Sequence, residues 1–162
     1  MDPNIYNRPN ADLERGKEVK GKSVKAIIVG ISIDIGGTII FATVLGMVVG
    51  AYYATQGMSP EAIQDKLSQL DIFSLYGIIG SIGGTLFSIL AGYMCAKISI
   101  NKIKRDILIL ALINSGLGFL MGMVNASLIE NMIFALITVA AIAVGAYLYT
   151  RLQRKEKASF LV

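Results

Sequence analysis

The sequence predicts an all-α membrane protein in which four helices cross the bilayer as an antiparallel bundle. Hydrophobic residues make up 54% of the 162 residues and are gathered into four long runs, whereas the charged residues, 16% of the total, lie almost wholly between those runs. A helix needs about 20 apolar residues to cross the ~30 Å hydrocarbon layer, and only helices or closed barrels satisfy their backbone groups there. The runs lack the alternating pattern of barrel strands, so we expect helices.

The chain divides into a polar N-terminal arm (1–24), a single transmembrane domain (25–150) and a basic C-terminal tail (151–162). The arm is polar and mixed in charge, and it lacks the short apolar core and cleavage site of a signal peptide, so we expect the first span to be retained. The four predicted spans cover residues 25–53, 72–96, 107–128 and 132–149.

The positive charges predict how the chain is oriented. Of the 15 Lys and Arg residues, six lie in the arm or directly after it, four lie between the second and third spans and four lie in the tail. The first connection has only Lys66, and the third has none. By the positive-inside rule, both termini are cytoplasmic. A nucleic-acid interface would need a basic face on a folded soluble domain, and no flanking segment is long enough to form one.

The connection between the first and second spans predicts a short outer helix. Ser59 offers a capping hydroxyl, Pro60 is tolerated in a first turn, and Glu61 places an acid near the positive end of the helix. We expect an amphipathic helix that lies on the outer surface and seals the bundle rather than gating it. Its apolar residues recur at helical spacing at Ile63, Leu67 and Leu70.

Small residues within the spans predict where the helices pack closely, because small-xxx-small rows let two backbones approach each other. The row on the first span is longer than a four-helix monomer needs, which leaves homo-oligomerisation open beside internal packing. The glycines assigned to packing are Gly36, Gly37, Gly46, Gly50, Gly80, Gly83, Gly84, Gly92, Gly118 and Gly122.

An Ile-Gly-Gly-Thr tetrapeptide occurs at a similar depth in the first span (35–38) and in the second (82–85). Two antiparallel helices could therefore cross closely near the middle of the bilayer. The paired glycines also weaken the helices, so hinges or unwound segments remain an alternative.

Asp34 is the residue that most needs an explanation. It lies about 13 Å beyond Lys25 along the first helix, close to the middle of the bilayer, where an acid costs roughly 2.5 to 3.5 kcal/mol. Ser88 and Asn114 fall in the same layer by the same count, with Thr38 one turn further on. Because no other charged residue lies deep enough to pair with Asp34, burial favours its uncharged form. These four residues form the predicted intramembrane polar cluster.

Two interpretations of this cluster stay open. In the first, Asp34 fixes helix register through Ser88 or Asn114, or contacts another membrane subunit. In the second, it gains and loses a proton or binds a cation during transport. The absence of His and the single Cys make a metal, haem or thiol site improbable, so we expect no metal and no cofactor. The scattered Ser, Thr and Asn residues do not form an enzyme site.

The segment 90–97, which reads Leu-Ala-Gly-Tyr-Met-Cys-Ala-Lys, resembles the end of the second helix in uncharacterised four-helix membrane proteins of bacteria. The resemblance implies a bacterial cytoplasmic membrane and no particular activity. The chain is also similar to small multidrug resistance transporters in its four helices and its acid in the first. It departs from them in using Asp rather than Glu, in lacking Trp and in its long polar arm.

We therefore expect a small structural or accessory membrane protein, with the lipid bilayer as its surroundings and a homo-oligomer or larger membrane complex as its assembly. The alternative is a proton- or cation-coupled transporter or channel that uses Asp34.

Overall fold

The computed structural model describes residues 22–68, 74–99, 102–122 and 127–159. Most of the predicted N-terminal arm lies outside them, as does Leu70. Within the described ranges all regular structure is helical. The elements are η1 (Ser32–Gly36), α2 (Gly37–Thr55), α3 (Pro60–Ser68), α4 (Leu75–Ile98), α5 (Ile103–Gly122) and α6 (Leu128–Ser159).

Three of the described helices are long and apolar enough to cross a membrane. The first runs from Lys22 to Thr55 and contains η1 and α2, and the others are Leu75–Ile98 and Leu128–Lys155. α5 is not among them, because charged residues occupy its first turn and its description ends at Gly122. The all-α class is therefore confirmed together with three candidate spans, whereas a fourth span and the antiparallel four-helix bundle stay predictions.

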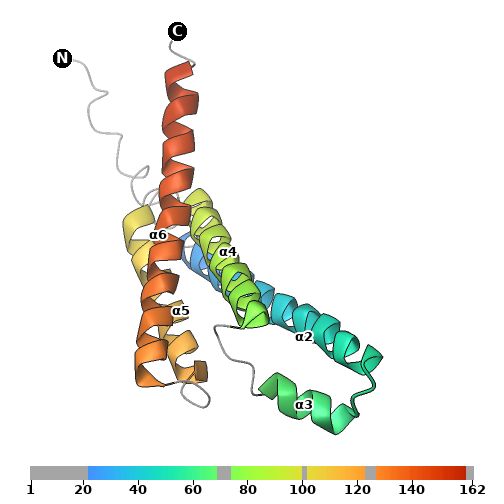
Figure 1. Cartoon of the computed structure of the whole chain (residues 1–162). Helices are drawn as coiled ribbons and strands as arrows, with labels where there is room; N and C mark the ends of the chain where they lie inside the picture. Colours follow the sequence, from blue (N-terminus) through green and yellow to red (C-terminus); the bar gives the residue numbers. More distant parts are fainter. Residues whose placement is uncertain (1–21, 69–73, 100–101, 123–126, 160–162) are drawn as a thin grey trace, which may run out of the picture.

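The helices pack around α4 and α6 (Figure 1). α4 lies along α6, α5 packs on α6, and the first helix packs on α4 through η1 and α2. α2 and α4 diverge from α5 and α6 toward the end where α3 lies, and α3 contacts α2. The best-buried apolar cluster lies at the opposite end, where all four long helices meet; it consists of Ala26, Cys95, Leu110, Ala111 and Ile142.

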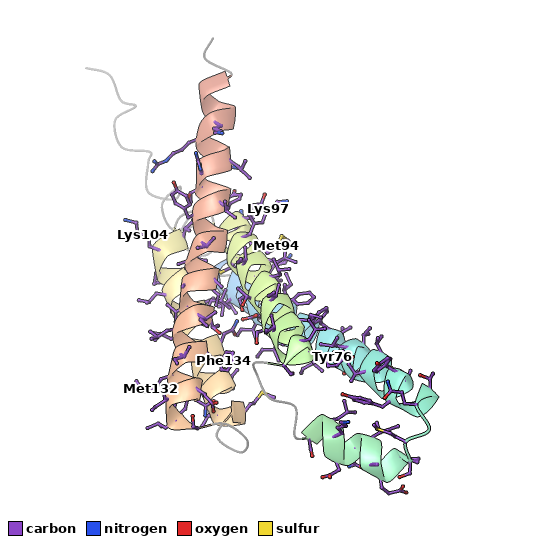
Figure 2. All side chains as sticks on the ribbon, viewed as in Figure 1. Tyr76, Met94, Lys97, Lys104, Met132 and Phe134 are labelled. Carbon is purple, nitrogen blue, oxygen red and sulfur yellow. The ribbon has the colours of Figure 1, made fainter. Side chains whose placement is uncertain are left out.

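The outward faces of the long helices are apolar. Ile40, Met47 and Leu136 are 67%, 68% and 69% exposed, and they are typical of many large apolar side chains on these faces. Exposed apolar surface on this scale is unusual for a soluble monomer and fits contact with lipid. Lys97 and Lys104 lie at one end of the bundle, and Met132 lies at the other (Figure 2).

Serine side chains define where the described helices begin. Ser59 Oγ accepts from the Ala62 N–H at 3.4 Å, so α3 starts at Pro60 as predicted. Ser74 Oγ accepts from the Gly77 N–H at 3.1 Å and caps α4.

α6 begins and ends beyond its predicted span of 132–149. Ser127 and Glu130 form a reciprocal capping box, in which the Ser127 N–H donates to Glu130 Oε2 at 2.7 Å and the Glu130 N–H donates to Ser127 Oγ at 3.3 Å. At its other end α6 continues to Ser159, because the segment predicted as a tail is rich in good helix formers such as Arg, Lys, Leu and Gln.

The closest approach between described helices is made by glycines of α4 and α6. A Cβ on Gly92 would overlap the backbone oxygen of Ile142, and a Cβ on Gly145 would overlap that of Ile89. The two helices therefore touch through their backbones, which only glycine permits. Gly92 was among the predicted packing glycines, but Gly145 was not.

Of the nine other predicted packing glycines, all but Gly122 fall into three groups. Gly37 and Gly83 lie under aromatic rings so closely that a Cβ would overlap them. At Gly50, Gly80 and Gly84 a Cβ would make an ordinary contact at 3.8 Å. The surroundings of Gly122 lie outside the described part of the chain. No described residue lies within 4 Å of a Cβ built on Gly36, Gly46 or Gly118.

Candidate functional site

The structure joins three of the four predicted cluster residues by direct hydrogen bonds. Ser88 Oγ of α4 donates to Asp34 Oδ1 at 2.7 Å, and Asn114 Nδ2 of α5 donates to Asp34 Oδ2 at 2.5 Å. The three residues are only 5% to 6% exposed. One carboxyl group therefore links three helices in the interior of the protein.

Asp34 lies in the π-helical turn η1, which interrupts an otherwise α-helical segment. A π turn closes i→i+5 hydrogen bonds and accommodates one extra residue. Because one residue corresponds to about 100° of rotation, the turn changes which face of the helix the following residues present. Gly36 ends this turn and Gly37 follows it, where the backbone is easily reshaped. The second glycine pair, at 83–84, lies in a regular α-helix.

A cavity of about 490 Å³ opens beside the three bonded residues. The first helix, α4, α5 and α6 all contribute to its walls, and Thr38 lines it together with Asp34, Ser88 and Asn114. From these residues the cavity extends toward Gly77 on α4 and Met121 on α5, so it lies in the part of the bundle where the helix pairs diverge. Its walls are largely apolar, and in the part of the chain that the structure describes Asp34 is the only ionisable residue that lines it.

The carbonyl oxygen of the Asn114 side chain has no hydrogen-bond partner among the described residues, although it is buried. Its amide nitrogen is bonded to Asp34, so the side chain is fixed while its acceptor stays unused. A buried acceptor left without a partner costs free energy. This oxygen therefore marks a place where a donor would be stabilised.

A second polar cluster, which the sequence did not predict, surrounds Asp106 at the start of α5. Ser99 Oγ of α4 donates to Asp106 Oδ2, and Arg105 donates to Oδ1 from Nε at 3.1 Å and from Nη2 at 2.9 Å. Burial opposes ionisation of the Asp106 carboxyl, but hydrogen bonds from Ser99, Ser23 and Arg105 and the Arg105 charge lower its pKa below the usual value. The sequence signal for this cluster was Asp106 itself, an acid within a connection that is otherwise basic. Counting only the cations of that connection passes over it.

The two clusters tie together the same three helices. Ser23 and Asp34 lie on the first helix, and Asp106 and Asn114 lie on α5. At 1.5 Å per residue the clusters are separated by roughly 12 to 17 Å along the helices. Each cluster is built on one carboxyl group, and only the cluster of Asp34 borders the 490 Å³ cavity.

The arrangement can hold a proton or a cation but offers no evident metal centre. In the described ranges, no three His, Cys, Asp or Glu residues are grouped so that they could hold a metal ion. Cys95 is a free, fully buried thiol in the apolar cluster, as expected of a small filler.

No protein-family model, curated protein or solved structure matches this chain. The fold and site therefore define its class on their own: an all-helical protein with three candidate membrane spans and a buried carboxyl group beside a largely apolar cavity.

Proposed function

We propose that this chain is a small multi-pass membrane protein whose cavity binds a solute and whose Asp34 carries a proton or cation during its transport. The observation that carries the proposal is that, among the described residues, Asp34 is the only ionisable one that lines a cavity of about 490 Å³. Cavities of about 300 to 1,000 Å³ are typical of small-molecule sites. Ionisable residues inside membrane bundles commonly mark proton and ion pathways. The proposed role is not enzymatic.

The hydrogen bonds around Asp34 give protonation a structural consequence. Both carboxyl oxygens accept a bond, one from Ser88 and one from Asn114, an arrangement suited to a carboxylate. Protonation turns one oxygen into a donor, and the bonded residue Asn114 carries a buried acceptor, Oδ1, that has no partner among the described residues. The Asn114 amide would have to turn over to accept that proton. Gain and loss of a proton would thereby alter a bond that joins the first helix to α5.

Membrane placement also belongs to this proposal. We place both termini in the cytoplasm, because the cations gather in alternate connections. The resemblance of segment 90–97 to bacterial membrane proteins is the ground for proposing a bacterial cytoplasmic membrane. Lys97 and Lys104 lie at the same end of the bundle, as that orientation requires (Figure 2). A fourth span through α5 is supported by Asn114, whose buried bond to Asp34 holds α5 against the first helix.

The test is proton-coupled flux in vesicles that contain the purified protein. Replacing Asp34 by Asn keeps the size of the side chain but removes its titratable group, so we expect Asp34→Asn to abolish the flux. Glu61→Gln is the matched control, because Glu61 is an exposed acid of α3, and its flux should equal that of the wild type. Unchanged proton-coupled flux in Asp34→Asn would overturn the proposal.

A structural or accessory role with homo-oligomerisation is the second candidate, and one observation favours it. Gly46 belongs to the small-residue row of the first helix, yet nothing lies within 4 Å of a Cβ placed there. No described residue of the monomer packs on that part of the row, so we infer that it is available to another helix. If Gly46→Ile reduces the oligomer measured by light scattering while Asp34→Asn keeps its flux, the accessory role is the correct one.

A further inference from the structure

We propose that the solute of this cavity is a small organic ammonium ion that carries at least one N–H donor and an apolar body. This inference rests on the proposed solute-binding function and names the chemical class of the solute. Three properties of the cavity carry it: the sign of its charge, an unused acceptor and the nature of its walls.

The charge of the cavity selects a cation. Asp34 is its only ionisable lining residue, and no Lys or Arg lines it among the described residues. A carboxylate in an apolar environment is costly unless an opposite charge lies close to it. Neighbouring Ser88 and Asn114 supply hydrogen bonds but no positive charge. A bound cation would supply the missing charge, whereas an anion would add to the repulsion.

The acceptors of the cavity select an N–H donor. A carboxylate offers about four acceptor positions, and the bonds from Ser88 and Asn114 use one position on each oxygen of Asp34. Asn114 Oδ1 is a further acceptor that has no partner among the described residues. The Asn114 residue lines the cavity and is only 5% exposed. A primary or secondary ammonium group can donate to both residues at once. A quaternary ammonium has the same charge but no donor.

The walls select an apolar body. Beyond the polar residues the cavity is lined by Leu117, Met121, Phe134 and Ile137. Its volume of about 490 Å³ exceeds what a bare metal ion needs. Hard cations prefer shells of six or more oxygen ligands, chiefly carboxylates and carbonyls. Among the described lining residues only Asp34 offers a carboxylate and only Asn114 a side-chain carbonyl, and the other side-chain oxygens are hydroxyls. An alkyl or aryl chain attached to the ammonium group would instead displace poorly held water from these walls.

The test compares three probes that share one phenylethyl body on the purified full-length protein in detergent: 2-phenylethylamine, its trimethylammonium analogue and 2-phenylethanol. We expect calorimetry to show saturable binding of the protonated amine. Binding of the quaternary analogue and of the alcohol should be weaker by about tenfold or more, because one lacks the donors and the other lacks the charge. Asp34→Asn should lose the preference for the amine, and Glu61→Gln should keep it. Equal affinity for the amine and the alcohol would overturn the proposal.

A second measurement needs no variant, so it remains decisive if Asp34→Asn does not fold. An apolar carbodiimide activates buried carboxyl groups, and mass spectrometry can follow the loss of unmodified Asp34 in the wild type, which counts both the carbodiimide adduct and any amide formed when the amine displaces the urea. We expect the amine to slow this labelling and the alcohol to leave it unchanged. Protection by sodium ions alone, with no effect of the amine, would show that the site takes a bare cation and would overturn the inference.

The two proposals fail in different ways. Amine binding that depends on Asp34, without proton-coupled flux, would remove the transport function and keep the ligand class. Proton-coupled flux that depends on Asp34, without amine binding or protection, would keep the function and remove the ligand class.

Discussion

Phe41 of α2 and Phe87 of α4 stand with ring centroids 6.2 Å apart and planes inclined at 57°, and each ring covers a glycine of the other helix. Phe41 lies on Gly83, and Phe87 lies on Gly37. These two reciprocal contacts, which we call the aromatic crossing, show that α2 and α4 run antiparallel here, and they define the register between the two helices. Continuing it by less than one turn along both helices brings Asp34 opposite Ser88, so the aromatic crossing helps to set the geometry of the polar cluster.

The aromatic crossing predicts an energetic coupling between its two rings. We expect the double variant Phe41→Ala/Phe87→Ala to be less destabilised than the sum of the single variants, with a coupling of about 0.5–1.5 kcal/mol. Denaturant unfolding of the purified protein in detergent measures each free energy. Phe41→Ala combined with Tyr147→Ala, which alters an exposed residue of α6, should be additive. A coupling of zero between Phe41 and Phe87 would show that the rings contribute independently.

The backbone contact between α4 and α6 predicts strong sensitivity at two glycines. Gly145→Ala and Gly92→Ala must push the helices apart, because the added methyl group would overlap a backbone carbonyl. We expect each to lower the free energy of unfolding by about 1–3 kcal/mol or more. Gly118→Ala is the matched control, since nothing lies within 4 Å of its Cβ position, and alanine favours the helix there. Equal stabilities for Gly145→Ala and Gly118→Ala would mean that α4 and α6 are not in backbone contact.

The cluster of Asp106 predicts a dependence of stability on acid. Its pKa is lowered in the folded protein, so its contribution is complete above the unfolded-state pKa of about 3.9 and is lost as the pH falls through the lower folded value. We expect the wild type to lose this contribution to its stability as the pH falls below about 4. Asp106→Asn should be less stable at neutral pH and should lack this part of the acid dependence. Identical pH profiles of unfolding in the two proteins would contradict the assignment.

The bond from Ser88 to Asp34 predicts a cost when the hydroxyl is removed. Ser88→Ala leaves one oxygen of a buried carboxyl group without its donor, so we expect a loss of about 1–3 kcal/mol in the free energy of unfolding. Ser115→Ala is the control, because the Ser115 hydroxyl bonds only to the Leu112 carbonyl of its own helix. That variant should stay within about 0.5 kcal/mol of the wild type. If the two variants are equally stable, the Asp34 cluster does not hold the helices together.

The sequence was sufficient to bring Asp34, Ser88 and Asn114 into one layer, because depth in a straight helix follows from a fixed rise per residue. Direct bonding among them also depends on rotation, and the π turn at Ser32–Gly36 alters that rotation. A π turn forms when tertiary contacts offset the free-energy cost of the irregular turn. The paired glycines therefore indicated only that the backbone can deform at this place.

The other omissions also have physical causes. Gly145 and Ala141 are four residues apart and form a small-xxx-small pair on α6. The pair was not singled out because the rows of small residues on the other helices are longer. Asp106 was missed because the positive-inside rule counts cations and disregards acids. The end of α6 was placed at Tyr149 because hydropathy marks where a span leaves the lipid, whereas the helix itself needs only good helix formers to continue.

α6 is long enough to join the packed interior of the bundle to a cationic segment beyond it. Arg151, Arg154 and Lys155 fall on one face of the same unbroken helix whose Gly145 is pressed against α4, about 15 Å before Lys155. On the membrane placement proposed above, a tilt of α6 about this contact would move its cationic face along the lipid headgroups. Such a tilt would couple changes inside the bundle to the charge presented at the membrane surface.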